Sequence, residues 1–405
     1  MRIILATYGS HGDVRPLLAL ALALKAAGHH VLLCAPPEHA DWVKTYGCSF
    51  RGLGSNFKAF IENSPGAHTL KAIPSFVRFL RREFESQFTQ LPAVIKGADL
   101  VLGASLTLGV PTVSESLGVP YHFICFCPQL LPSSQHPSLL IRSHSLPPWL
   151  NRLSWWLTDR INHFNFRVII NRKRCRLGLK PIRDGWRHLL GNHVIVASDH
   201  VLGSVPTDVE MGYTQIGYLH LHQTGELSAD LEGFLASGPL PIYVGFGSMP
   251  DGDPVATTRM VVEAARAAGQ RIVVSCGWAR LGQIEAGEDC HVAANVPHMI
   301  LFPRVAAVVH HGGSGTTAAA ARAGIPQVIV PHVLDQYYWA SQIYRLGLGP
   351  KPVWRSRLTI ERLSVALREC LSNQTIHQHA CQVAGILQGQ DSLREAVRLI
   401  ESLET

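Results

Sequence analysis

The sequence lacks several patterns that would assign it to common enzyme classes. It contains no GxxxxGK segment followed by Ser or Thr, which argues against a P-loop kinase or ATPase, and no GxSxG segment, which argues against an α/β-hydrolase. Gly245-Phe246-Gly247 lacks the third glycine of a dinucleotide fingerprint, which argues against NAD. No carboxylate triad with metal-ligand spacing occurs, so the charge of a bound phosphate would have to be balanced by helix dipoles and hydrogen bonds.

Cysteines and charges show little organisation. The nine cysteines form no CxxC pair and no regular framework, so we interpret them as reduced core thiols of a cytosolic protein. Charged residues make up 16% of the chain, and a net charge of +7 with a pI of about 9.0 suits an anionic ligand or an anionic membrane surface. No nucleic-acid module signature is present, so nucleic acid is not an expected partner.

Long apolar runs are also missing. The most apolar helical stretch, residues 17–27, is too short to span a bilayer and contains Lys25. The sequence starts directly with a strand-like segment at Ile3, without the features of a secretory signal. With 405 residues and 47% hydrophobic content, the chain is expected to form two or three globular domains in the cytoplasm.

Strand and helix patterns alternate through both halves of the chain. The first half begins with a strand at residues 2–7, a glycine turn and a helix that Pro16 is expected to open, and the pattern restarts at residues 242–246. This alternation predicts an α/β fold of two Rossmann-like, doubly wound domains that face each other across a cleft. The expected divisions are residues 1–205, a connecting region at 206–240, residues 241–385, and a terminal helical segment at 386–405.

The most informative stretch runs from Val308 to Thr317. A buried strand leads into crowded glycines and then into a helix expected at residues 316–323. The free N–H groups of a first helical turn attract anions, and His311 can donate a hydrogen bond to a phosphate oxygen. Neighbouring strand residues point to opposite faces, so one of His310 and His311 is expected to be packed inside, and no metal site is predicted.

Five segments, in matching order, resemble the signatures of glycosyltransferases that use nucleotide sugars and have two Rossmann-like domains, the GT-B fold. The likeness is to the bacterial glycopeptide and sterol glucosyltransferases of UDP-glycosyltransferase family 1, and it covers nearly the whole chain. The resemblance implies an acceptor-binding first domain, a second domain that binds the sugar donor, and a terminal helix that crosses back onto the first. The segments are residues 9–16, 34–37, 243–250, 296–298, and 310–317 with Asp335-Gln336.

Asp13, in the first glycine turn, is the predicted catalytic base. Glycosyl transfer to a hydroxyl needs a group that removes the acceptor proton, and a nearby helix N-terminus favours the ionised carboxylate. The alternative is that Asp13 only caps the helix. The resemblance places a catalytic Asp or His at this position. His11, where many relatives carry Arg, is the second candidate for the base.

The resemblance also implies the contacts to the sugar donor. Ser248 would contact the distal phosphate, or it would only cap the next helix. Asp335-Gln336 would bind the hydroxyls of the sugar, and Asp335 could also cap a helix. Trp278 would wall the nucleotide pocket or pack in the core. The backbone of Val296 would read the base, which leaves UDP and dTDP open. Residues of the two glycine turns complete the predicted donor-binding set: Ser10, Gly12, His311, Gly313, Ser314, Gly315 and Thr316.

Aromatic residues mark the expected acceptor site. Phe76 and Phe79 belong to a helical stripe that continues to Phe88, and the arginines beside it are interpreted as a solvated face. Together with Phe126 and Trp155, these two phenylalanines form the predicted acceptor-binding set.

Residues 149–175 form a second amphipathic stretch that carries extra tryptophans and arginines. It has two interpretations: a helix whose apolar stripe packs on the first domain, or a helix that contacts an anionic membrane. Under both, the segment walls an apolar acceptor pocket. The stripe consists of Leu150, Leu153, Leu157, Ile161, Phe164 and Val168.

These features together predict an inverting, metal-independent hexosyltransferase. It would move a hexose, with glucose as the first expectation, from a UDP- or dTDP-sugar to a hydroxyl of an apolar small molecule such as a sterol, a polyphenol or another natural product. No metal and no cofactor beyond the sugar donor are expected. The alternatives are a sugar-nucleotide epimerase or hydrolase, and a non-catalytic nucleotide-sugar-binding subunit that activates another enzyme. We expect a monomer or weak dimer.

Overall fold

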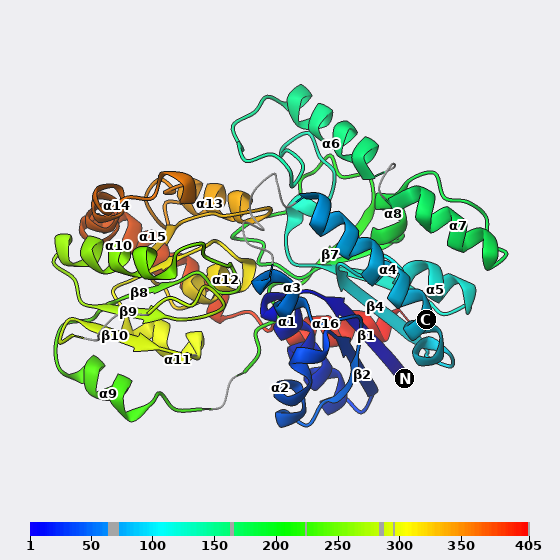
Figure 1. Cartoon of the computed structure of the whole chain (residues 1–405), viewed down its shortest axis with the longest axis horizontal. Coiled ribbons are helices and arrows are strands. Elements are labelled where there is room, and N and C mark those ends of the chain that lie inside the picture. The colour runs from blue at the N-terminus through cyan, green and yellow to red at the C-terminus, as the bar shows by residue number, and fades with distance from the viewer. Residues whose placement is uncertain (64–72, 163–165, 223–224, 283–286, 295, 404–405) are drawn as a thin grey trace. The chain divides into compact units, whose positions relative to one another are not determined.

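The computed structural model describes residues 1–63, 73–162, 166–222, 225–282, 287–294 and 296–403. The chain divides into two compact units. Unit 1 comprises residues 1–200, 204–221 and 391–405, and unit 2 comprises residues 201–203 and 222–390. Each unit is built on one parallel sheet with helices on both sides, which confirms the prediction of two Rossmann-like α/β domains (Figure 1).

The sheet of unit 1 orders its strands β3-β2-β1-β4-β5-β6-β7, and all of its pairings are parallel. Buried apolar residues dominate the central strands, as expected for a sheet covered on both faces. The strands are β1 (Arg2–Tyr8), β2 (His30–Ala35), β3 (Ser49–Gly52), β4 (Leu100–Ser105), β5 (Tyr121–Cys125), β6 (His193–Val196) and β7 (Gly212–Gln215).

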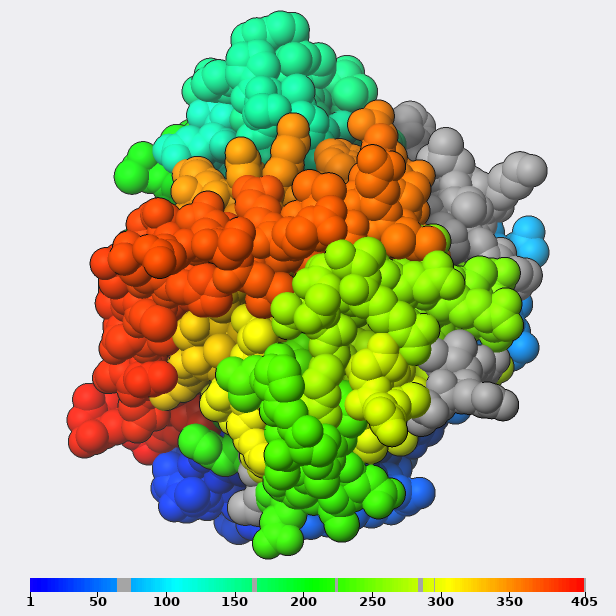
Figure 2. All heavy atoms as spheres, turned by 90° about the vertical axis from the view of Figure 1, so that its left-hand side faces the viewer, coloured from blue at the N-terminus to red at the C-terminus, as the bar shows by residue number. Residues whose placement is uncertain are grey.

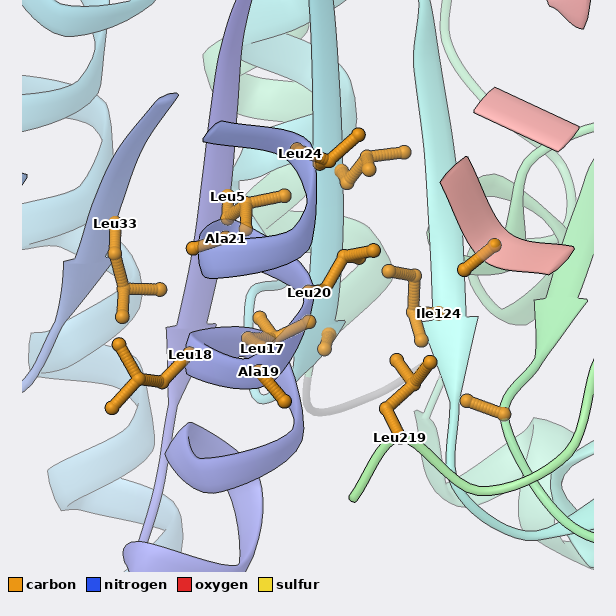
Figure 3. Close-up of a cluster of buried hydrophobic side chains, with 14 of the residues drawn as sticks. Leu5, Leu17, Leu18, Ala19, Leu20, Ala21, Leu24, Leu33, Ile124 and Leu219 are labelled. Carbon is orange, nitrogen blue, oxygen red and sulfur yellow. The ribbon is translucent and has the colours of Figure 1, made fainter. Parts of the chain in front are cut away.

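The helices of unit 1 cover this sheet. Leu17 and Leu20 of α1 pack toward Leu5 of β1 and Ile124 of β5, so that the first helix and the centre of the sheet share one apolar core (Figure 3). The helices are α1 (His11–Ala26), α2 (Ala40–Thr45), α3 (Phe57–Glu62), α4 (Ile73–Ile95), α5 (Val110–Ser116), α6 (Pro148–Asn162), α7 (Val168–Arg176), α8 (Gly185–Leu190) and α16 (Ser392–Ser402). Among the residues that the structure describes, no helix combines the length and apolar character needed to cross a bilayer.

Unit 2 repeats the architecture with the strand order β10-β9-β8-β11-β12, again parallel throughout. Figure 2 shows the surface on which α10 and α14 lie side by side. The strands are β8 (Ile242–Gly245), β9 (Ile272–Ser275), β10 (Cys290–Ala293), β11 (Ala307–His310) and β12 (Gln327–Ile329). The helices are α9 (Ala229–Ala236), α10 (Pro254–Ala267), α11 (His298–Leu301), α12 (Ser314–Arg322), α13 (Gln336–Arg345), α14 (Ile360–Ser372) and α15 (Gln374–Gln388).

The main crossing between the units falls between Leu221 and His222, inside the connecting region expected at 206–240, but ordered elements occupy much of that region. Residues 212–215 are a strand of the first sheet, and residues 229–236 form a helix of unit 2. Some glycines of this region therefore belong to ordered elements, and the region as a whole is not one linker. At the other end, the chain returns to unit 1 from Asp391, and Ile400 of α16 is buried in the core formed with α1.

Two local expectations are corrected by the structure. The first helix begins at His11, not at Pro16, because the Ser10 side chain caps it together with Asp13 in a capping box. Pro16 is the sixth residue of this helix, beyond the first turn in which proline is best tolerated. The interpretation of the cysteines as core thiols fails for Cys175 and Cys381, which are exposed.

Candidate functional site

Each sheet has a point where the strand order reverses, and the predicted site residues follow the strands at these points. In unit 1 the reversal lies between β1 and β4, and in unit 2 between β8 and β11. Helices leave a doubly wound sheet on opposite faces at such a switch point, which opens a crevice beyond the carboxyl ends of the two strands. The connections that start there contain Asp13 and Ser105 in unit 1, and Ser248 and His311 in unit 2.

Asp13 is held at the start of α1 by both of its carboxylate oxygens. The Ser10 backbone N–H donates to Oδ2 at 2.7 Å, and the Ser10 hydroxyl lies 3.2 Å from the same oxygen. The Ser10 Oγ in turn accepts from the Gly12 N–H at 3.3 Å. A Cβ atom on Gly9 would stand 2.3 Å from Oδ2, so only glycine fits there. The capping role of Asp13 is therefore real, and it fixes the direction of the carboxylate.

Ser105 supplies the third contact, and sequence reasoning did not identify it. Its hydroxyl donates to Oδ1 of Asp13 at 2.6 Å. Ser105 ends β4 opposite Tyr8 of β1, and its backbone has a φ of +56°, the left-handed region that non-glycine residues rarely adopt. Strain of this kind persists where the surrounding structure enforces it, often at functional sites. A polar residue at the end of a strand beside the switch point was the only signal in the sequence.

Burial dominates the ionisation of Asp13. Burial raises the pKa of its carboxyl, while the hydrogen bonds from Ser105 and Ser10 lower it, and the net shift is upward. The nearby helix N-terminus favours the ionised form, so burial acts in the opposite direction to the helix dipole. A raised pKa makes the ionised carboxylate a stronger base.

His11, the second candidate base, lies in a separate ring cluster. Its imidazole packs edge-on against His39 at 4.7 Å and against Trp42 at 5.1 Å between ring centroids. Burial, followed by the charges of His39 and Arg15, lowers the pKa of His11 to about 3. The imidazole is therefore neutral at physiological pH and only weakly basic, which makes it a poorer proton acceptor than Asp13.

The predicted acceptor residues Phe76 and Phe79 belong to an aromatic cluster that reaches the first glycine turn. Phe79 is buried, stacks on Phe60 at 3.7 Å, and lies 6.2 Å from the ring of Tyr8. Phe76 is half-buried beside Phe60 at 6.2 Å. Since Tyr8 immediately precedes the turn that carries Asp13, this cluster brings apolar surface to the neighbourhood of the candidate base.

Phe126 and Trp155, the other predicted acceptor residues, lie elsewhere in unit 1. Phe126 follows β5 and packs partly against the core under α1. Trp155 lies on α6, where its ring packs near Trp186 and its indole N–H donates to the His136 carbonyl at 3.2 Å. No contact that the structure shows joins either residue to Phe79 or Asp13.

In unit 2, the helix that follows β11 begins without a side-chain cap. Its N-cap residue is Gly313, and Ser314, Gly315 and Thr316 form the first turn of α12. No side chain caps this turn, so its N–H groups are available to an anion, and the helix dipole adds positive potential at the same place. The predicted phosphate cradle thus coincides with the second switch point.

The two adjacent histidines have different roles. His310 is fully buried: its Nε2 bonds to Gln327 Oε1 at 2.9 Å, and its Nδ1 accepts from the Gly312 N–H at 3.1 Å, so it shapes the glycine turn. His311 is half-buried, and burial lowers its pKa to about 4, which leaves a neutral ring. Its Nδ1 is buried and has no hydrogen-bond partner among the described residues. A buried ring nitrogen without a partner suits a hydrogen bond to a ligand.

Close packing joins the loops after β8, β9 and β11. A Cβ on Gly247 would lie 2.9 Å from the His311 ring, and one on Gly313 would lie 2.5 Å from it. Gly247, just before Ser248, also accepts the Trp278 backbone N–H at 2.9 Å. The structure therefore brings Ser248, Trp278 and His311 to one place in unit 2. Glycine is required there because the loops leave no room for side chains.

Asp335 and Gln336 open α13 beside these loops. The Gln336 amide oxygen accepts from the His332 and Val333 N–H groups at 2.8 and 3.0 Å, and its nitrogen lies 3.2 Å from the Met249 sulfur. Gln336 therefore orders the loop before the helix. Asp335 is the N-cap residue, but its side chain makes no capping hydrogen bond, so the capping alternative is wrong for its carboxylate.

Val296 is buried in a different cluster, formed with Leu301 and Phe302. With Pro297 it lines a cavity of about 240 Å³ that also contacts α9. Its neighbour Asn295 lies outside the described residues. Among the residues described, no group of three or more His, Cys, Asp or Glu side chains is arranged to hold a metal ion.

Each half of the chain matches the model of a known protein family. The family model of the glycosyltransferase family 28 N-terminal domain matches residues 3–133, and that of the erythromycin biosynthesis protein CIII-like C-terminal domain matches residues 260–403. The chain is 36% identical to the vancomycin aglycone glucosyltransferase of Amycolatopsis orientalis, over 99% of this chain and 97% of that protein. It is 32% identical to a sterol 3-beta-glucosyltransferase of Arabidopsis thaliana, over 98% of this chain and 67% of that protein.

Solved structures agree on the fold. The structure of the glycosyltransferase of kitacinnamycin covers 99% of this chain and 98% of its own, with a TM-score of 0.73 at 19% identity. The structure of the glycosyltransferase VinC in complex with dTDP covers 100% of this chain and 99% of its own, with a TM-score of 0.71 at 19% identity. Because the sequence relatives extend over both units at more than 30% identity, the chain belongs to the glycosyltransferase family of the vancomycin and sterol 3-beta-glucosyltransferases and is a hexosyltransferase of the GT-B fold.

Proposed function

We propose that this protein is an inverting, metal-independent glycosyltransferase that moves a hexose, glucose in the first place, from a UDP- or dTDP-sugar to a hydroxyl of an apolar small molecule. Sterols, polyphenols and other natural products are the acceptor classes. The observation that carries the proposal is the oriented carboxylate of Asp13 at the switch point of unit 1, held by Ser10 and Ser105. A cytoplasmic location completes the proposal.

The reaction needs one base and one stabilised leaving group. Asp13 would take the proton of the acceptor hydroxyl while the oxygen of that hydroxyl forms a bond to the anomeric carbon. The bond from that carbon to the phosphate oxygen breaks on the opposite side, which inverts the configuration. The nucleoside diphosphate leaves with its charge stabilised by the first turn of α12 and by a hydrogen bond from neutral His311.

The surroundings of the base favour an apolar acceptor. The aromatic cluster of Tyr8, Phe60 and Phe79 adjoins the turn that carries Asp13. Flat aromatic surface beside a hydroxyl-activating carboxylate suits a polycyclic alcohol better than a free sugar. The names of the relatives, a glycopeptide aglycone glucosyltransferase and sterol glucosyltransferases, support the same class.

Turnover of UDP-glucose and dTDP-glucose with a panel of sterol, flavonoid and macrolide acceptors tests the proposal. Formation of a glucoside from at least one acceptor is the expected result. Release of free glucose without any acceptor product would favour a hydrolase. A changed sugar nucleotide would favour an epimerase, and binding without turnover would favour a non-catalytic subunit.

Replacing Asp13 by Asn should lower turnover by about 100-fold or more, because the amide keeps an oxygen for the capping contacts but cannot accept the proton. Affinity for UDP, measured by calorimetry, should remain nearly unchanged. In the wild type, kcat/KM should fall as pH drops below the raised pKa of Asp13, and this decline should vanish in Asp13→Asn. Near-normal turnover of the variant would reject Asp13 and favour His11 as the base.

Ser105→Gly should separate the positioning of the base from the backbone strain. Glycine accepts a φ of +56° freely, and losing the small serine side chain removes the hydroxyl that donates to Asp13. We expect kcat to fall on the order of tenfold, the scale of one hydrogen bond to a charged group. Because the Ser105 hydrogen bond lowers the pKa of Asp13, the acidic limb of the pH profile should move to higher pH.

The matched control is Ser105→Asn, since asparagine tolerates a left-handed backbone and its amide N–H can donate to the carboxylate. This variant should recover part of kcat and return the pH limb toward that of the wild type. An unmoved pH limb in Ser105→Gly would show that Ser105 only supports the fold.

His311→Ala should weaken the binding of UDP by about 1–3 kcal/mol, the scale of a lost hydrogen bond to a charged group. Calorimetry on the purified protein measures the loss. His377→Ala, on α15, is the control and should bind UDP like the wild type. Equal affinity of His311→Ala and the wild type would remove His311 from the phosphate site.

Chelation tests the absence of a metal requirement. Turnover should persist after dialysis against EDTA and should not rise when Mg²⁺ or Mn²⁺ is added, because the helix N-terminus and hydrogen bonds are proposed to balance the phosphate charge. Loss of activity that a divalent cation restores would overturn the metal-independent mechanism.

A further inference from the structure

Helix α6 lies at the outer edge of unit 1 (Figure 1). Its large apolar side chains are mostly exposed to the solvent. The exposed side chains recur at steps of four, three, one and four residues, so they lie on one face of the helix. They are Trp149, Leu153, Trp156, Leu157 and Ile161, with relative exposures between 42% and 64%. Of the two interpretations of this stretch, packing of the stripe on the first domain is therefore wrong for Leu153, Leu157 and Ile161.

The face of α6 that packs on unit 1 is mainly polar. Asn151 donates to the Ser134 carbonyl at 2.9 Å, Ser154 accepts from the Ser138 N–H at 2.9 Å, and Thr158 donates to the Ser138 hydroxyl at 2.8 Å. These contacts recur at steps of three and four residues, on the side opposite to the exposed stripe. Rolling the helix to bury its apolar stripe would break all of them.

The segment under α6 is itself fixed. The Ser133 hydroxyl donates to Asp208 at 2.6 Å, and the Ser134 N–H donates to the other oxygen of Asp208 at 2.7 Å. Trp155, the half-buried aromatic residue of the helix, is anchored there through its bond to His136. The outward orientation of the stripe is thus a property of a well-connected structure. A surface helix normally does the reverse and buries its apolar stripe.

Positive charge accompanies the exposed stripe. Arg152 and Arg160 are exposed on α6, and the Arg160 guanidinium lies 5.2 Å from the centre of the Trp156 ring. Asp159 is the one acidic residue of the helix and is half-buried. Tryptophan rings settle at the level of lipid headgroups, and arginines beside them reach anionic phosphates. A convex apolar helix face with cations beside it suits insertion into a deformable lipid surface, whereas a protein partner would need a matching groove.

Two basic residues after α6, Lys173 and Arg174, do not share this role. Arg174 is buried and makes two hydrogen bonds with Glu115 at 2.6 and 2.9 Å, and Lys173 forms an ion pair with Glu85. Their charges are balanced within unit 1. The apolar surface that points to a lipid partner is the exposed side of α6.

We propose that α6 docks the protein peripherally on an anionic lipid surface, with the helix lying in the plane of the membrane and the side chains of Trp149, Trp156 and Leu157 among the acyl chains. This inference goes beyond the proposed reaction and does not depend on it. Where both hold, apolar acceptors dissolved in the membrane would be concentrated near the unit that carries Asp13.

Co-sedimentation of the full-length protein with vesicles tests the docking. Vesicles of phosphatidylcholine with about one-third phosphatidylglycerol should bind the protein at low salt at least tenfold better than pure phosphatidylcholine, and about 0.5 M salt should weaken that binding. The emission of the exposed tryptophans should shift to shorter wavelength on binding. No binding to anionic vesicles at low salt would overturn the proposal.

A triple variant, Trp149→Ser, Trp156→Ser and Leu157→Ser, should lose at least tenfold in vesicle affinity and keep the thermal midpoint of the wild type, because all three side chains are exposed. The control variant replaces three other exposed apolar residues, Leu117, Val365 and Ile386, by Ser and should bind vesicles normally. Equal vesicle binding by the triple variant and the wild type would refute the role of α6.

Two other results with the same triple variant would show that something other than lipid binds the exposed face of α6. If the wild type self-associates in sedimentation and the triple variant does not, while neither binds vesicles, the face is an interface between copies of this chain. If the triple variant only raises KM for a soluble acceptor, the face belongs to the acceptor site. Either result would overturn lipid docking. Turnover on that acceptor also reports separately on the proposed reaction.

Discussion

The parallel pairing of β1 with β4 in unit 1, and of β8 with β11 in unit 2, is the constraint on which the candidate site residues of each unit depend. Each pairing joins strands whose following connections leave the sheet on opposite faces, so backbone and side chains after the strands face an open crevice. The register sets Tyr8 opposite Ser105 and His310 opposite Gly245. A one-residue slip would turn alternate side chains to the other face and separate Ser105 from Asp13.

Asp13 illustrates how a structural and a chemical role can reside in one side chain. The capping box gives the carboxylate a fixed direction, and burial gives it a higher pKa than a solvated aspartate. Three hydrogen bonds from Ser10 and Ser105 act against burial and stabilise the ionised form. The balance of these opposing effects determines the pH at which the proposed base is ionised, and Ser105 makes the largest of the contributions that lower the pKa.

The sequence predicted those parts of the structure that depend on local pattern. Strand-turn-helix units with crowded glycines located Asp13 and His311, and alternation of strands and helices predicted the two parallel sheets. Ser105 was missed because its contact with Asp13 joins residues 92 positions apart and arises only from strand pairing. The start of α1 was misplaced because the capping box of Ser10 and Asp13 determines it, and not the proline that follows.

Helix α6 marks a second limit of pattern-based prediction. Periodicity shows that a helix has an apolar and a polar face, but it does not show which of them the fold binds. Here hydrogen bonds of Asn151, Ser154 and Thr158 hold the polar face inward, and much of the apolar face stays exposed. The exposed tryptophans add little to the fold of unit 1, and the proposed lipid contact would give them a role. Since α6 and the candidate base belong to the same unit, such a contact would hold the unit that carries Asp13 at the surface that α6 touches.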